Sequence, residues 1–142
     1  MDILILNGPN LNLLGTRQPE IYGHQTMEEV VGDLRKDFPQ INLHYFQSNH
    51  EGVIIDKLQE VGFTYDGIIL NAGGYTHTSI AMADCVSAIS TPVVEVHISD
   101  IYNREAYRAH SYIKPVATHQ IVGQGINGYK LGIKYLLASK TA

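Results

Sequence analysis

Cysteine and tryptophan are scarce in this chain of 142 residues, which has one cysteine, Cys85, and no tryptophan. A single cysteine excludes an intrachain disulfide, and a domain of this length can bury a sufficient core without one. No apolar run is long enough to cross a membrane, and no charged-then-apolar leader opens the sequence. We therefore expect one domain, residues 1–142, in the reducing cytoplasm and without a membrane partner.

Basic residues are also few. The chain has ten Lys and Arg residues and 14 Asp and Glu residues, which gives a formal net charge of −4. Binding to nucleic acid needs a clustered basic face, and the basic residues here are scattered, so we expect no nucleic-acid partner. The seven histidines form no H-E-x-x-H or similar ligand spacing, and no Gly-Lys-Ser/Thr of a phosphate-binding loop occurs, so we expect no metal site.

What the chain does contain is an alternation of short apolar runs with segments of helical spacing. The runs at residues 3–6, 41–46, 67–70, 93–96 and 120–122 predict strands. Helices are predicted from Thr26 to before Pro39, after Asn49, over residues 79–89 and over residues 127–137. This alternation is typical of an α/β fold, a doubly wound five-stranded parallel sheet with helices on both faces.

Each predicted strand ends in a polar segment. Because parallel strands present their carboxyl ends at one edge of the sheet, we expect one crevice there. It should collect Asn10, Asn71, His97 and Ser99. The loop after the first strand carries several amides, an arginine and a tyrosine, which indicates the wall of an active site.

Glu95 and His97 lie two residues apart in an otherwise apolar predicted strand. Their side chains then point to the same face of the sheet. A buried carboxylate needs a partner, and Glu95 would orient the His97 ring while its other nitrogen stays free to give or take a proton. The alternative is a purely structural ion pair at a strand end.

Tyr22 is a candidate base. A free phenol titrates near pH ~10, so a tyrosinate at neutral pH needs about 4 kcal/mol of preferential stabilisation of its anion. A close arginine in a water-poor pocket can supply much of this, and Arg17 or Arg108 are the candidates. The alternative is a loop tyrosine that only packs or forms hydrogen bonds.

Two glycine-containing segments have alternative interpretations. The segment 71–79 offers Asn71 and His77 as ligands for hydroxyl groups, or it is only a tight turn with a helix cap. The segment 123–128, GQGING, matches the dinucleotide-binding fingerprint, but it follows the last predicted strand instead of the first. We therefore expect a turn and a helix start there.

Four motifs together resemble type II 3-dehydroquinate dehydratase. They are NGPNLNLLGTR at 7–17, FQSNHEG at 46–52, YTHTS at 75–79 and EVHIS at 95–99. The resemblance implies a flavodoxin-like fold and a lyase that reversibly dehydrates 3-dehydroquinate to 3-dehydroshikimate in the shikimate pathway of aromatic amino acid biosynthesis. It implies catalysis without metal or organic cofactor, and a homo-oligomer, a dodecamer built from trimers.

The resemblance also assigns roles to residues. Tyr22 would remove a proton beside the ketone, and Arg17 would hold it as tyrosinate. Asn10 would help to stabilise the enolate through an ordered water, and His97, oriented by Glu95, would protonate the departing hydroxyl. The implied substrate-binding residues are Asn71, His77, Asp84, Ile98, Ser99 and Arg108, with Asp84 supplied by a neighbouring subunit.

Other protein classes fit less well. A flavodoxin-like FMN carrier needs a hydroxyl-rich phosphate loop and aromatic flavin walls, whereas this loop is rich in amides. A phospho-receiver carries acidic residues at the end of the first strand, where this chain has Asn7. A structural assembly protein has no reason to aim Glu95 and His97 at one crevice.

Overall fold

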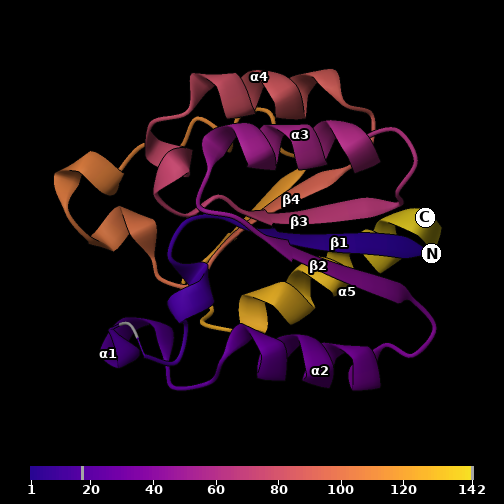
Figure 1. The fold of residues 1–142 in the computed structure, drawn as a ribbon, viewed down its shortest axis with the longest axis horizontal. Helices are drawn as coiled ribbons and strands as arrows, with labels where there is room; N and C mark the ends of the chain where they lie inside the picture. Colours follow the sequence, from indigo (N-terminus) through magenta and orange to yellow (C-terminus); the bar gives the residue numbers. More distant parts are fainter. Residues whose placement is uncertain (17, 142) are drawn as a thin grey trace.

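The computed structural model describes residues 1–16 and 18–141 and contains a five-stranded parallel sheet with helices on both faces (Figure 1). The strands are β1 (Asp2–Asn7), β2 (Asn42–Gln47), β3 (Gly67–Asn71), β4 (Val93–His97) and β5 (His119–Val122). Their order in the sheet is β2-β1-β3-β4-β5, and each neighbouring pair is parallel. This order is that of a flavodoxin-like sheet, and it confirms the predicted fold class.

Helices α3 and α4 cover one face of the sheet, and α2 and α5 cover the other (Figure 1). The α-helices are α1 (Pro19–Tyr22), α2 (Met27–Asp37), α3 (Glu51–Val61), α4 (Ile80–Ala88) and α5 (Asn127–Thr141). The 3-10 helices are η1 (Leu11–Leu13), η2 (Gly73–His77), η3 (Ile101–Asn103) and η4 (Ala106–Arg108). The four long helices were predicted, whereas α1 and the 3-10 helices are too short to produce a periodic pattern.

Local sequence sets the ends of the long helices. The Thr26 hydroxyl accepts a hydrogen bond from the Glu29 N–H, and the Glu29 carboxylate accepts one from the Thr26 N–H, so α2 begins with the predicted capping box. The Ser79 hydroxyl accepts from the Met82 N–H at the start of α4. Residue Phe38 follows α2 and precedes Pro39, where helical backbone is disfavoured.

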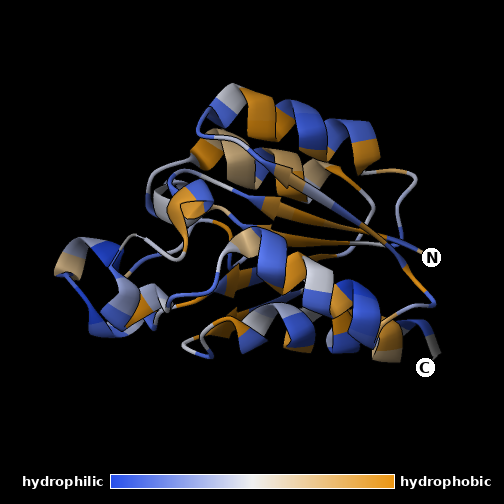
Figure 2. Ribbon diagram, turned by 60° about the horizontal axis from the view of Figure 1, so that its bottom comes forward, coloured by the Kyte–Doolittle hydropathy of each residue, from blue (hydrophilic) through white to orange (hydrophobic). Residues whose placement is uncertain are grey.

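The sheet separates two hydrophobic cores. Figure 2 shows the apolar strands between helices whose residues alternate between hydrophobic and hydrophilic. One core lies under α2 and α5 and includes Ile5, Val30 and Ile133. The other lies under α3 and α4 and includes Leu4, Leu58 and Met82.

The most deeply buried residues of helix α5 are not all among its most conspicuous apolar positions. The apolar positions Leu131, Tyr135 and Leu137 are only half-buried, whereas Tyr129 and Ile133 are fully buried. The inner side of the helix also carries glycines: a Cβ at residue 128 would lie 3.1 Å from Val96 Cγ1, and one at residue 132 would lie 3.3 Å from Ile69 Cδ1. These glycines let the helix lie close to the sheet, and they add nothing to an apolar pattern in the sequence.

Candidate active site

A pocket of about 120 Å³ lies at the carboxyl ends of the strands. In Figure 1, helix α1 and the orange segment after β4 lie at this end of the sheet, away from both termini. The residues that line the pocket include Asn10, Tyr22, Asn71, Gly73, His77, His97, Ile98, Ser99, Arg104 and Arg108. The predicted convergence of Asn10, Asn71, His97 and Ser99 on one crevice is therefore confirmed.

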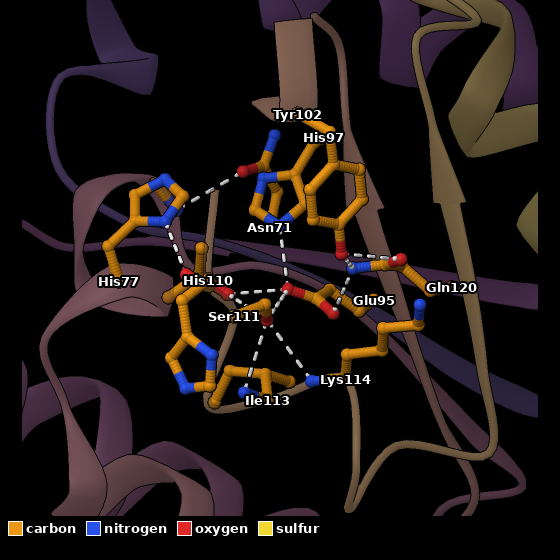
Figure 3. Close-up of polar contacts among 12 residues, drawn as sticks. Asn71, His77, Glu95, His97, Tyr102, His110, Ser111, Ile113, Lys114 and Gln120 are labelled. Atoms are coloured by element: carbon orange, nitrogen blue, oxygen red, sulfur yellow. Dashed lines mark hydrogen bonds and ion pairs between the residues drawn. The ribbon is translucent and has the colours of Figure 1, made fainter. Parts of the chain in front are cut away.

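Glu95 and His97 form the predicted pair at the end of β4 (Figure 3). His97 Nε2 lies 2.7 Å from Glu95 Oε2, and both side chains are buried, Glu95 completely. Their spacing of two along the strand places them on the same face, as the alternation of a strand requires. The carboxylate therefore fixes the orientation of the imidazole.

The Glu95 carboxylate is surrounded by hydrogen-bond donors. Thr76 Oγ1 and Ser111 Oγ donate to Oε2, the second at 2.7 Å, and Gln120 Nε2 donates to Oε1 at 2.9 Å. Burial acts to raise the pKa of Glu95, but hydrogen bonds from His97, Thr76 and Ser111 and the charge of His97 outweigh it, so this pKa lies below its ordinary value. Glu95 is thus an ionised acceptor, His97 carries a proton on Nε2, and Nδ1 is the nitrogen left for the pocket.

A guanidinium contacts the phenol of Tyr22. Arg104 Nη1 donates to Tyr22 Oη at 2.9 Å and to Ser99 Oγ at 3.3 Å. Tyr22 is 8% exposed and the Arg104 side chain 13%, so the contact is largely shielded from water. Arg104 is a residue that the sequence analysis missed, although it lies on the polar segment that follows β4. Arg17, which was predicted for this role, lies outside the described residues.

His77 belongs to the segment between β3 and α4, where the structure has η2 in place of a simple tight turn. Its Nδ1–H donates to the His110 carbonyl at 2.7 Å. Burial lowers the pKa of His77, and the charges of His97 and Arg108 lower it further, against the opposing effect of the His110 carbonyl. A neutral imidazole that donates through Nδ1 leaves Nε2 as a hydrogen-bond acceptor.

The remaining predicted residues divide between the pocket and the surface. Asn10 lines the pocket with left-handed backbone (φ 70°), and its N–H donates to Asn49 Oδ1 at 3.0 Å. Arg108 lines it too, and its Nε donates to the Glu105 carboxylate at 2.7 Å. Asp84 is exposed on α4 and is not one of the residues lining the pocket of its own chain.

Residues 1–16 and 18–141 show neither a metal-binding cluster nor a membrane-spanning helix. No cluster of three or more His, Cys, Asp or Glu side chains there has an arrangement that could hold a metal ion. None of the helices in this part of the chain is long and apolar enough to cross a membrane.

In chemical terms, the pocket contains a phenol held by a guanidinium and an imidazole held by a carboxylate. The first pair is suited to accept a proton, because the cation favours the phenolate. The second is suited to donate one. Both can act on one bound molecule, because Tyr22 and His97 line the same cavity.

Comparisons with known proteins agree with this geometry. Residues 1–137 match the family model described as Dehydroquinase class II. The 3-dehydroquinate dehydratase of Bacillus subtilis (strain 168) is 52% identical over 139 residues, which cover 96% of this chain and 94% of that protein. That of Gloeothece citriformis is 50% identical over 133 residues, 92% of this chain and 88% of that protein. The crystal structure of type II dehydroquinase from Butyrivibrio crossotus DSM 2876 superposes with a TM-score of 0.93 at 45% identity, covering 96% of this chain and 97% of that chain.

Proposed function

The chain belongs to the class II dehydroquinase family, and from that premise we propose that Tyr22 and His97 are the base and the acid of its reaction. The reaction is the dehydration of 3-dehydroquinate to 3-dehydroshikimate, a lyase step of the shikimate pathway. One observation carries the assignment of the two residues. Each lines the same pocket with a partner of opposite charge close by, Arg104 at 2.9 Å and Glu95 at 2.7 Å.

In the first step, the Tyr22 phenolate takes a proton from the carbon beside the ketone. The electron pair of that C–H bond moves onto the ketone oxygen and forms an enolate. Asn10 stabilises the enolate through an ordered water, and a preplaced donor of this kind contributes about 3–4 kcal/mol. Arg104 holds the phenolate, and Arg17 adds a second cation in the role that the resemblance gives it.

In the second step, His97 acts as the imidazolium, with a proton on each ring nitrogen, and gives its Nδ1 proton to the departing hydroxyl. The enolate returns its electron pair, the C–O bond breaks, and water leaves as the carbon–carbon double bond forms. Glu95 stabilises the protonated imidazole and keeps Nε2 bound, so that Nδ1 faces the hydroxyl. Splitting the elimination in this way lets a base and an acid of different strength act in sequence.

Other lining residues hold the substrate. Ile98 and Ser99 grip its carboxylate, and Arg108 and Asn71 bind its oxygen atoms. His77 accepts a hydrogen bond from a substrate hydroxyl, which its free Nε2 supports, because the Nδ1–H is already used on the His110 carbonyl.

Isotope exchange tests the two roles separately. In ²H₂O, His97→Gln should exchange the substrate proton beside the ketone for deuterium while it forms little 3-dehydroshikimate, because the base still works and the acid is missing. Tyr22→Phe should do neither. Deuterium uptake is followed by NMR, and the conjugated enone of the product by its ultraviolet absorbance. Exchange at wild-type rate by Tyr22→Phe would remove Tyr22 from the role of base.

We also propose that the protein assembles as a dodecamer built from trimers, in which Asp84 completes the pocket of a neighbouring subunit. Two features of α4 support this: Asp84 is exposed, and Ile80, one turn earlier on the same face, is 58% exposed. Mixed assemblies of Asp84→Ala and Tyr22→Phe subunits should regain activity, because some pockets then combine an intact Tyr22 with an intact Asp84. Activity of Asp84→Ala alone at the wild-type level would contradict the proposal.

The reaction is further proposed to need neither metal nor organic cofactor, because proton transfers alone balance it. Activity should survive dialysis against a chelator, and borohydride should not inactivate the enzyme, because no lysine imine forms. We place the protein in the cytoplasm, where the thiol of Cys85, buried and free, stays reduced.

A further inference from the structure

A buried tyrosine hydroxyl connects the ends of two neighbouring strands at the pocket. Tyr129, in the first turn of α5, is fully buried. Its hydroxyl accepts a hydrogen bond from Asn71 Nδ2 at 3.0 Å and donates one to Asn7 Oδ1 at 2.9 Å. Asn7 and Asn71 are the last residues of β1 and β3 and lie opposite each other in the sheet. Asn71 is the member of this chain of hydrogen bonds that lines the pocket.

One backbone group sets the direction of the whole chain. The Gly73 N–H donates to Asn71 Oδ1 at 3.2 Å, and an N–H can only donate, so the oxygen of the Asn71 amide must face it. The Nδ2 end then faces Tyr129, whose own proton goes to Asn7. Burial raises the pKa of Tyr129 far above its ordinary value, so the hydroxyl stays protonated at neutral pH and the direction does not reverse.

We propose that Tyr129 is a positioning residue for the reaction, because its hydroxyl fixes the Asn71 amide in the orientation that binds substrate. The inference rests on the proposed substrate-binding role of Asn71. After its bonds to Gly73 and Tyr129, Asn71 retains one Nδ2–H and one lone pair on Oδ1, so it can serve a substrate hydroxyl as donor and as acceptor. Without the Tyr129 hydroxyl, an Nδ2–H loses its buried acceptor, and the single 3.2 Å hydrogen bond from the Gly73 N–H is left to hold the amide in this orientation.

Kinetics of four variants test the proposal. The variants are Tyr129→Phe, Asn71→Ala, the double variant of these two, and Tyr135→Phe as the matched control. Tyr135 lies further along α5, is half-buried and stacks on the His119 ring at 4.3 Å, away from the pocket lining. The assay is the ultraviolet absorbance of 3-dehydroshikimate formed from 3-dehydroquinate, with KM and kcat determined separately.

We expect Tyr129→Phe to raise KM about tenfold, which corresponds to about 1.4 kcal/mol of substrate binding. The kcat should change less than about threefold, because the base and the acid are untouched. Asn71→Ala should raise KM at least as much, and the double variant should match Asn71→Ala, because the effect of Tyr129 passes through Asn71. Tyr135→Phe should leave both constants unchanged.

The alternative, that Tyr129 only stabilises the fold, has a different signature. Partial unfolding lowers the amount of active enzyme and so lowers the apparent kcat, but it leaves KM unchanged; that result would overturn the proposal. So would a rise in KM by the same factor with and without the Asn71 side chain. If Asn71→Ala itself leaves KM unchanged, the proposed binding role of Asn71 is wrong. If Asn71→Ala raises KM and Tyr129→Phe does not, only the positioning role fails.

Discussion

Removal of the Arg104 guanidinium should slow the reaction and shift its pH dependence. Arg104 Nη1 lies 2.9 Å from the Tyr22 hydroxyl, and both side chains are largely buried. If Tyr22 acts as a phenolate, this contact becomes a charged hydrogen bond. The variant Arg104→Ala therefore tests the physical basis of the proposed base.

The distance between the Arg104 guanidinium and the Tyr22 hydroxyl sets the size of the expected effect on the rate. Two unit charges 2.9 Å apart attract by about 6 kcal/mol at an effective dielectric constant of about 20. A phenol needs about 4 kcal/mol of preferential stabilisation to be an anion at neutral pH, so the attraction has the size that the proposed base requires, before the cost of burying the phenolate is subtracted. In the variant, water enters the vacated space, and Arg17 supplies a second cation if it takes its proposed place. Both restore part of the lost stabilisation of the phenolate. Truncation of one partner of a buried charge pair costs about 2–5 kcal/mol, and a loss of about 2–4 kcal/mol lowers kcat about 30- to 1,000-fold.

The assay follows formation of 3-dehydroshikimate by its ultraviolet absorbance from about pH 6 to about pH 10. In Arg104→Ala the rate should climb with pH, because an unassisted phenol ionises only near pH ~10. Arg104→Lys keeps the positive charge but loses the planar guanidinium with its several donors. Its kcat should therefore lie between the values for the wild type and for Arg104→Ala. Arg35→Ala is the control, because Arg35 is exposed and its guanidinium binds the Leu43 carbonyl, away from the pocket. A wild-type kcat and pH profile in Arg104→Ala would refute the reasoning.

Three further predictions concern Glu95 and two glycines. Glu95→Gln removes the charge that orients and stabilises the His97 imidazolium, so kcat should fall about 100-fold or more while KM changes little; an unchanged kcat would exclude the acid role of the pair. The folded-state pKa of Glu95 lies below its ordinary value, so its contribution to stability is present above about pH ~4.3 and is lost as pH falls through the folded-state pKa. As the pH is lowered, the urea unfolding midpoint of Glu95→Gln should therefore fall less steeply than that of the wild type. If the two midpoints fall in parallel with pH, the ionised Glu95 does not stabilise the fold. A Cβ at residue 8 would lie 2.4 Å from the Ala72 carbonyl oxygen, so Gly8→Ala should lower the free energy of unfolding by about 1–3 kcal/mol. A Cβ at residue 52 on α3 meets open space, so Gly52→Ala should raise the free energy of unfolding by about 0.5–1 kcal/mol. Equal midpoints of the two variants in thermal unfolding would contradict this difference.

The strands of a parallel sheet and the position of the pocket could be predicted from the sequence because both follow from short-range patterns. Apolar runs identify the strands, and parallel pairing brings their polar ends to one edge. The pairing of Glu95 with His97 follows from the alternation of side chains along one strand. These features need no knowledge of contacts between distant segments.

The residues that the sequence analysis missed depend on such distant contacts. Arg104 meets Tyr22 across 82 positions of sequence, and Tyr129 meets Asn7 across 122. No periodic pattern in the sequence predicts either contact. Tyr129 is further concealed because its neighbours on the inner face of α5 include Gly128 and Gly132, which add nothing to an apolar pattern around it.

The division of the interior into two cores has a practical consequence for engineering. Tyr22 and Tyr129 both belong to the core under α2 and α5, and the sheet shields them from the layer of α3 and α4. Substitutions that share no neighbours add nearly independently. A thermostable variant is therefore best sought by repacking around Leu58 and Val61 on α3, a helix that carries no proposed site residue, so that gains in melting temperature need not be traded against turnover.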